Sequence, residues 1–364
     1  MSLDINDWLT VTRDERIVGK NQLLNEATKQ RYFCMSKMWK NAEEKFRGGE
    51  NLVDHIQGDT LGNAGRYNPE DRFNVSTRDT TVPISVPWAY LQAHYPVVRE
   101  ARELNSGNVS AFVNYMLVLE QGCLVDKVNV MEEECWALPN RELMEDANTE
   151  LQARQPYSIL SFITRDGLAP SATNGGLATG SSAWTTIQSI NPTTRTWFRN
   201  QTQNYNSAAK NDLNDGIVPA MDAMIEEVQF DMPGELAKYA EDQGLQNQCI
   251  VTNLEGLTDY KAALRSLNDQ MSMLSDPTIR GAQFNGVPVK FISELENAGW
   301  TAGQPDFLFI NFSFLFPFVH TNNYMREEIT PGGPEHPNKT VVWKFTWNNV
   351  ICRSRRRQGR ISAS

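Results

Sequence analysis

Apolar side chains recur every three or four positions over residues 108–137, which is the period of one helix face. Asn108 stands where an N-cap residue is expected, and Pro139 ends the pattern. A helix of this length extends about 45 Å at 1.5 Å per residue. The pattern therefore predicts one long helical strut in the middle of the chain.

Shorter periodic segments surround this strut. Helical periods predict further helices over residues 3–47, over residues 215–230 and between Leu257 and Leu274. Apolar runs predict a strand at 249–253, a strand pair at 284–292 and a strand at 306–312. This alternation of strand and helix indicates a mixed α/β region. The stretch from Ala169 to Ala183 is rich in Gly, Ser, Thr and Asn and is interpreted as a mobile loop.

Residues 51–105 have neither a helical period nor the composition of a simple loop. Pro83, Pro87 and Pro96 exclude a long helix and disfavour a central strand, so the segment is predicted to be extended and to lie at an edge. Its apolar side chains need burial that a lone arm cannot give, and a neighbouring copy could supply it. These side chains are Phe73, Val82, Ile84, Val86, Trp88, Tyr90 and Tyr95.

The chain closes with a strand that leads into a cluster of arginines. Its alternation places the large apolar side chains Val341, Trp343, Phe345 and Trp347 on one face, which we expect to be buried in an outer domain. The pattern changes phase at residues 348–349, where a β-bulge is predicted. Five arginines follow within eight residues, namely Arg353, Arg355, Arg356, Arg357 and Arg360. They either contact phosphate or pair with acids on an adjoining subunit, and the second interpretation is preferred.

Composition narrows the class of function. The chain carries 44 acidic and 34 basic residues, a net charge of −10, which argues against a general DNA-binding protein because such proteins bind phosphate through clustered Lys and Arg. No apolar run is long enough to span a membrane, and the early acids predict that no secretory signal is present. The five cysteines are scattered and are expected to be small core residues of a protein made in a reducing compartment.

No motif for catalysis, cofactor binding or metal binding is evident. The stretch GGLATGSS has the glycine spacing of a phosphate loop, but Ser181 replaces the required lysine. NDLNDG resembles part of a calcium loop, but Leu213 stands where an oxygen ligand is needed, so the stretch is interpreted as a helix start. The four histidines lack ligand spacing, and the acidic pairs are expected to be solvated. The sequence thus predicts a protein that is not an enzyme, with no cofactor.

The order of the parts resembles the major capsid proteins of tailed double-stranded DNA bacteriophages, which have the α+β Hong Kong 97-type capsid fold. The stretches RYNPEDRFNVSTRDTTVPISVPWAYL, GSSAWTTIQSINPTTRTWFRN, CIVTNLEGLTDYKAALRSL, FNGVPVKFISELE, DFLFINF and WKFTWNNVICRSRRRQGRIS carry the resemblance. It implies an N-terminal arm (1–50), an extended loop (51–107), a peripheral domain (108–214) with the spine helix 108–137, an axial domain (215–330) and a closing peripheral segment (331–364).

The resemblance also implies function and partners. Many copies would form pentamers, hexamers and an icosahedral shell around packaged double-stranded DNA, which the shell contacts weakly. A portal protein is a further implied partner, with scaffolding and decoration proteins as possible ones, and no membrane is involved. The virion capsid is the implied location, with synthesis and assembly in the bacterial host cytoplasm. Since only about 50 residues precede the extended loop, scaffolding is expected from a separate protein, and no lysine–asparagine cross-link is predicted.

Two other classes of function stay open. An encapsulin-like shell with enzyme cargo has the same fold, and an enzyme or adhesin that uses the extended loop as a lid is a more distant alternative. Under the capsid reading, contacts between copies are predicted at Trp8, Trp39, Phe73, Val82, Ile84, Val86, Trp88, Tyr90, Arg353, Arg355, Arg356, Arg357 and Arg360.

Overall fold

A computed structural model of the protein describes most of the chain in separate ranges. These are residues 32–39, 44–46, 49–58, 62–64, 66, 68, 77, 79–98, 109–146, 154–164, 177–179, 182–184, 186–192, 194–228, 247–266, 282–297, 303–331 and 338–363. Trp8, Phe73, Asn108 and most of the helix predicted over 3–47 lie outside the described residues.

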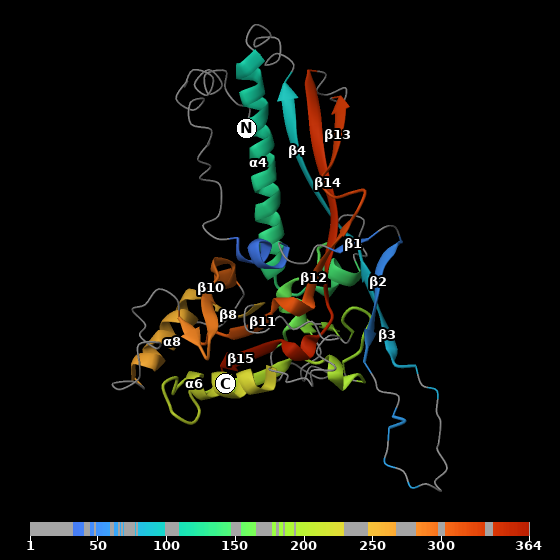
Figure 1. The fold of residues 1–364 in the computed structure, drawn as a ribbon. Helices are drawn as coiled ribbons and strands as arrows, with labels where there is room; N and C mark the ends of the chain where they lie inside the picture. The colour runs from blue at the N-terminus through green and yellow to red at the C-terminus, as the bar shows by residue number, and fades with distance from the viewer. Residues whose placement is uncertain are drawn as a thin grey trace.

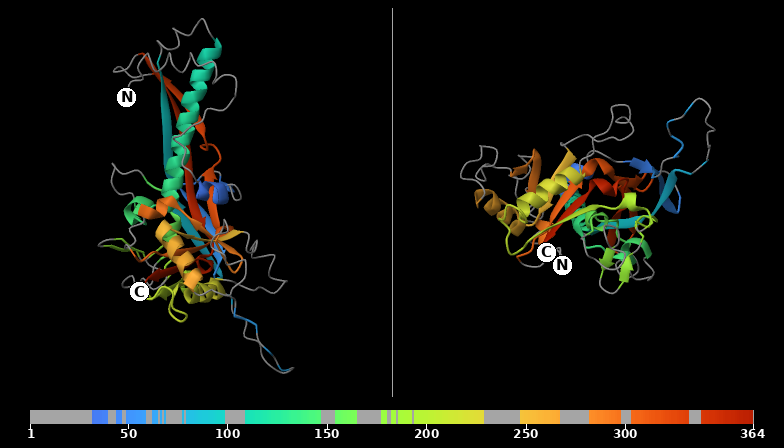
Figure 2. Two further views of the ribbon diagram at one scale, coloured as in Figure 1. Left: turned by 90° about the vertical axis from the view of Figure 1, so that its left-hand side faces the viewer. Right: turned by 90° about the horizontal axis from the view of Figure 1, so that it is seen from below.

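A long upright layer forms one half of the molecule (Figure 1). Its centre is the strand β14 (Lys339–Cys352), which pairs antiparallel with β4 (Ala89–Val98) along one edge. Along the other edge, β14 pairs with β13 (Arg326–Pro331) and then with β12 (Leu315–His320). β1 (Glu44–Phe46) joins the outer side of β12 in parallel. The helix α4 (Val109–Trp136) runs along this sheet, as the left view of Figure 2 shows.

A second sheet lies at the foot of this layer (Figure 1). It has six strands in the order β7-β15-β11-β8-β10-β9. Two helices, α6 (Ile217–Val228) and α8 (Leu254–Ser266), share one core with it. The strands are β7 (Gln201–Tyr205), β8 (Gln248–Thr252), β9 (Gln283–Phe284), β10 (Val287–Phe291), β11 (Phe307–Asn311) and β15 (Gly359–Ala363).

Short helical elements lie between or before the longer ones. They are η1 (Met35–Trp39), η2 (Glu142–Asp146), α5 (Ile159–Phe162), η3 (Thr196–Phe198), η6 (Ser293–Asn297), η7 (Phe312–Phe314) and η8 (Arg355–Arg357). Among the described strands, two hairpins do not pair with a strand of either sheet. They are β2 (Asn51–Gln57) with β3 (Thr81–Pro87), and β5 (Leu177–Thr179) with β6 (Ser182–Trp184). The β2–β3 hairpin leads away from the body at the lower right of Figure 1.

Most of the periodic segments are confirmed. The helix predicted over 108–137 is α4, and that over 215–230 is α6. The predicted strands at 249–253, 284–292 and 306–312 correspond to β8, the pair β9–β10, and β11. The three prolines lie in β3 and β4, each of which pairs with a single strand among the described residues, as an edge position requires.

The expected burial of the closing strand is wrong in phase. Val342, Lys344, Thr346 and Asn348 are the buried positions, and the apolar alternates between them are only half-buried. The buried face turns toward α4, where Val342 shares a small cluster with Cys123. The sequence pattern failed because a polar set of side chains fills the interior between helix and sheet.

The predicted bulge at 348–349 is also wrong. Residues 339–352 form one strand whose pairing registers with β4 and β12 are constant. The burial pattern changes there because β14 passes from a sheet with one exposed face into the junction of the two sheets. From Asn348 to Cys352 every residue is buried.

The domain boundaries implied by the resemblance do not follow the sheets. β12 and β13, expected in the axial domain, pair with β14 beside α4. β15, expected with the peripheral segment, lies between β7 and β11 of the six-stranded sheet. The stretch from Ala169 to Ala183, interpreted as a loop, contains the β5–β6 hairpin among its described residues.

All five cysteines are buried and unpaired, which confirms their predicted place in the core. In the part of the chain described here, no helix meets the length and hydropathy needed to cross a membrane. Glycine at position 359 permits a close approach, since a Cβ there would lie 2.3 Å from Sδ of Met224 on α6.

Glu132 belongs to the run of adjacent acids at 132–134, which was expected to be solvated with the other acidic pairs, and it is instead fully buried. Its carboxylate accepts hydrogen bonds from the backbone N–H groups of Cys34 and Met35, at 2.9 Å each, and from Nε1 of Trp136. The negative charge thus binds the first turn of the segment 33–39, where helix N–H groups are unsatisfied. This contact fixes η1 against α4.

Lys127 is a buried charge between α4 and β14. It is 1% exposed, and its Nζ donates to the carbonyl of Lys344 at 3.4 Å. Burial, together with the nearby Lys344 ammonium, lowers the pKa of Lys127 from 10.5 to about 8. The folded subunit therefore releases this proton at a lower pH than the unfolded chain does.

We predict that the free energy of unfolding gains a contribution from Lys127 that rises with pH between about 8 and 10.5. In that window the unfolded state binds more protons, so raising the pH favours the folded state. Urea unfolding of wild type and Lys127→Met at a series of pH values measures the effect. Lys127→Met should be at least as stable at pH 7 and should lack this rise, and equal pH dependence of both proteins would contradict the assignment.

Candidate assembly surfaces

The C-terminal arginines lie where the chain passes from one sheet to the other. After β14 ends at Cys352, the turn η8 redirects the chain into β15. Arg355 is fully buried in this turn. Its guanidinium donates to the carbonyl of Phe162 at 2.8 Å, to the carbonyl of Phe198 at 3.4 Å and to Oδ1 of Asn200 at 3.2 Å. Burial lowers the pKa of Arg355 to about 10.

The other arginines also have partners within the chain. Arg353 pairs with Asp54 of the hairpin at 2.8 Å and stacks over the ring of Phe316. Arg360 pairs with Asp306 at 2.5 Å. Arg357 is buried over the ring of Phe314, at 4.3 Å from its centroid.

The expectation that these arginines lie at a seam with a neighbour is therefore corrected for the buried Arg355 and Arg357, and it stays a prediction for Arg353 and Arg360, which are partly exposed. Each of them connects parts of the same subunit, because the turn between the two sheets is crowded with carbonyls and carboxylates. Arg356 alone among them has an exposed side chain.

The apolar side chains of the extended segment are divided between interior and surface. Ile84, Val86 and Trp88 are at most 1% exposed, and Trp39 is 7% exposed, all within one core cluster of their own chain. The expectation that a neighbouring copy buries them is thus wrong, because β2, β3 and η1 fold against the body of the same chain. Val82 is half-buried and Tyr90 is 54% exposed.

The outer face of the long sheet carries a row of half-exposed rings, here called the aromatic face. It consists of Tyr90 and His94 on β4 with Trp343, Phe345 and Trp347 on β14. Tyr90 meets Trp347 edge-on at 5.0 Å between centroids, and His94 lies 4.6 Å from Trp343. Trp343 and Phe345 are parallel at 6.1 Å.

The aromatic face has a charged rim on β13. Arg326 and Glu328 stand beside Phe345 and Trp343 in register and approach one another at 3.8 Å. Large aromatic surface with a polar border is typical of protein interfaces. The sequence singled out Tyr90 but missed the rest of this face, since it placed the tryptophans in the interior.

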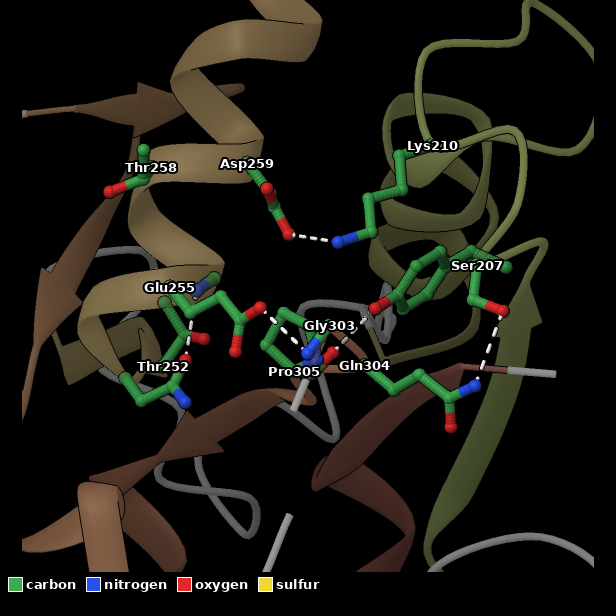
Figure 3. A network of polar contacts seen from close by, with 12 residues as sticks. Ser207, Lys210, Thr252, Glu255, Thr258, Asp259, Gly303, Gln304 and Pro305 are labelled. Atoms are coloured by element: carbon green, nitrogen blue, oxygen red, sulfur yellow. Dashed lines mark hydrogen bonds and ion pairs between the residues drawn. The ribbon is translucent and has the colours of Figure 1, made fainter. Parts of the chain in front are cut away.

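A polar network lies at one end of the six-stranded sheet, where β7 and β8 end and β11 begins (Figure 3). Lys210 pairs with Asp259 of α8 at 2.5 Å, and Glu255 of α8 accepts from the backbone N–H of Gly303 at 2.7 Å. Tyr205 donates to the carbonyl of Pro305 at 2.8 Å. These bonds connect the turn after β7, the helix α8 and the segment before β11.

Two exposed leucines belong to the segments that this network connects. Leu213, in the turn that contains Lys210, is 74% exposed, and Leu254, the first residue of α8, is 56% exposed. Within the described residues no group of three or more His, Cys, Asp or Glu side chains is arranged to hold a metal ion.

Comparison with solved structures places this geometry among phage capsids. The chain is similar to a chain of the cyanophage A-1(L) capsid asymmetric unit, with a TM-score of 0.53, 12% identity, and coverage of 94% of both chains. It is also similar to a chain of the capsid of an empty GTA particle (TM-score 0.49, 13% identity, covering 94% of this chain and 95% of that one). For a chain of the native GTA particle capsid the TM-score is 0.48 and the sequence identity is 12%, with coverage of 96% of this chain and 98% of that one.

No family model matches the sequence. No curated protein matches it either. The likeness to the cyanophage capsid chain, at 12% identity, confirms the phage capsid fold that the order of the sequence segments predicted.

We predict that Arg355→Met destabilises the subunit by about 3 kcal/mol or more, because the acceptors of Phe162, Phe198 and Asn200 lose a charged donor in the interior. Arg356→Met is the matched control and should change stability by less than about 0.5 kcal/mol, since its side chain is exposed. Thermal unfolding of the two variants decides. Similar melting temperatures for both would show that Arg355 does not fix the turn.

Proposed function

We propose that this protein is the major capsid subunit of a tailed bacteriophage, which assembles through copies of itself into a closed icosahedral shell. The observation that carries the proposal is the likeness to the cyanophage capsid chain over 94% of both chains. Function is inferred from fold here, so the surfaces of the subunit must supply independent support.

The distribution of apolar side chains supports self-association. The described surface exposes seven large apolar side chains: Val53, Tyr90, Val130, Leu138, Leu213, Leu254 and Ile329. They are spread over the hairpin, both sides of the long layer and the edge of the six-stranded sheet. When a neighbouring copy covers such side chains, the free energy of association becomes more favourable by about 25 cal/mol for each Å² of apolar surface that is buried. Several separate contacts per copy are what a lattice of subunits needs.

The projecting hairpin supports contacts that are not self-complementary. An element that extends from one side of a subunit meets a different surface on its neighbour, and repetition of such a contact closes into rings. We infer pentameric and hexameric rings joined into the shell. β4 also leaves its outer edge unpaired among the described strands. Pro96 on that edge limits uncontrolled strand addition.

We infer double-stranded DNA as the content of the shell. A net charge of −10 gives each subunit little general affinity for phosphate, so packaged DNA would touch the wall weakly. A portal protein is a further inferred partner, and separate scaffolding or decoration proteins fit the same scheme. Assembly would take place in the host cytoplasm.

Electron microscopy of the purified protein tests the proposal. Expressed subunits should form closed shells or rings, and shells recovered from infected cells should contain DNA. Monodisperse monomers at high concentration would refute self-assembly. Shells filled with protein cargo instead of DNA would favour the encapsulin-like alternative.

We predict that Tyr90→Ser on the aromatic face weakens assembly without weakening the subunit. Tyr90 is 54% exposed, so its removal should cost the monomer less than about 1 kcal/mol. Burial of its ring between copies should contribute about 1–2 kcal/mol, which corresponds to roughly a tenfold rise in the concentration needed for assembly. Light scattering against protein concentration measures this.

Gln92→Ser is the matched control, because Gln92 is an exposed polar residue on the same face of β4. It should leave the assembly threshold unchanged. If Tyr90→Ser assembles at the wild-type threshold, the aromatic face is not a contact between copies.

A further inference from the structure

A polar hollow of about 420 Å³ opens at the foot of the β2–β3 hairpin. Its lining comes from the hairpin, from Tyr90 at the start of β4, from η2 and from two connecting segments, and it includes Glu50, Ser85, Glu145, Arg154, Tyr157 and Ser189. These segments are far apart in sequence and meet only in the folded subunit. The hollow is separate from the site of the buried Arg355, because Phe162 and Phe198, whose carbonyls bind Arg355, are not in its lining.

Arg154 in this lining is incompletely bonded. Its Nε is buried and has no hydrogen-bond partner among the described residues. A charged donor that loses water and gains no acceptor is unfavourable, so Arg154 needs an acceptor that the described residues do not supply. The nearby Glu145 is already engaged, because its carboxylate accepts from the hydroxyl of Tyr157.

The walls of the hollow are fixed in place before any partner binds. The backbone N–H of Tyr157 donates to Oδ1 of Asn349 at 2.9 Å, and Nδ2 of Asn349 donates to the carbonyl of Pro87 at 2.6 Å. Ser189 donates to the carbonyl of Ser85 at 3.1 Å.

The turn that carries Ser189 is strained. Gln188 and Ser189 have φ angles of 54° and 65°, in the left-handed region that disfavours residues other than glycine. The flanking bridge between Ile187 and Ile190 and the buried positions of both isoleucines hold the turn in this conformation. Strain of this kind is common where the backbone shapes a binding site.

We propose that the hollow receives a side-chain carboxylate from a second copy of this chain, and that Arg154 binds it through Nε and a terminal nitrogen. The proposal rests on the proposed function, which supplies the neighbouring copy. The planar guanidinium matches a carboxylate in a two-bonded arrangement.

The charges around the hollow favour a carboxylate over a phosphate. Glu50 and Glu145 line the same space, and they oppose a phosphate with its larger charge more strongly than a single carboxylate. The chain itself has 44 acidic residues against 34 basic ones, so each copy presents a surplus of carboxylates to its neighbours. The site thus acts as a contact between copies at the root of the hairpin.

An assembly assay with three variants tests the proposal. Arg154→Gln should fold with a wild-type melting temperature, because Nε has no acceptor within the described chain, and should raise the concentration needed for assembly about tenfold. Arg154→Lys, which keeps the charge but lacks the planar fork, should lie between Arg154→Gln and wild type. Lys290→Gln removes an exposed positive charge on β10, outside the lining of the hollow, and should assemble normally. Normal assembly of Arg154→Gln, or its failure to fold, would overturn the proposal.

A second measurement does not depend on assembly. Blocked glutamate (N-acetylglutamate amide) at millimolar concentration should shift the Nε–H resonance of Arg154 in ¹⁵N-labelled subunits held below the assembly concentration, and sodium phosphate should shift it less. Absence of a shift with blocked glutamate, or a larger shift with phosphate, would overturn the proposal. If wild type never assembles, the proposed function fails, and this resonance still decides whether the hollow binds a carboxylate.

Discussion

The burial of one guanidinium at the junction of two sheets is the constraint on which the rest of this subunit depends. β14 is the centre of the long sheet and β15 an inner strand of the other, so the few residues between them set how the halves meet. Arg355 occupies that turn with hydrogen bonds to three separate segments. Gln358 continues the junction, bonding through its side chain to both backbone groups of Asn311 on β11.

The outer face of the long sheet takes no part in this junction. The interior between α4 and the long sheet is partly polar, with Lys127, Lys344 and Glu120 in contact, so the large rings of β14 face outward. In a lone subunit that arrangement leaves aromatic area in water. In the proposed shell, the same rings would form contact surface between copies, and the subunit would reach its lowest free energy among other copies.

The β2–β3 hairpin likewise has a buried part that fixes it to the subunit and a part that leads outward. Its root is fixed by Ile84, Val86 and Trp88 in the core and by the pair of Arg353 with Asp54, whereas its described strands lead away from the body. A rigid root gives a projecting element a defined direction, which a contact with a neighbour requires. The polar hollow lies at that root, where a second copy would be held close to the element that reaches it.

The sequence by itself determined the elements whose signal is local. Period and proline position gave α4, α6, the strands β8, β9, β10 and β11 of the six-stranded sheet and the edge character of residues 81–98, and the order of these parts gave the fold. It could not decide which face of β14 is buried, because alternation fixes two faces but not which one meets the helix.

Only the tertiary structure decided what each charged or aromatic side chain does. The arginines after Cys352 have the composition of an exposed basic segment, and Glu132 has that of a solvated acid. Arg355 and Glu132 became interior groups because the fold brings backbone acceptors and donors to them from segments far along the chain. Burial, pairing and free surface are properties of such distant contacts, and a local pattern of residues does not contain them.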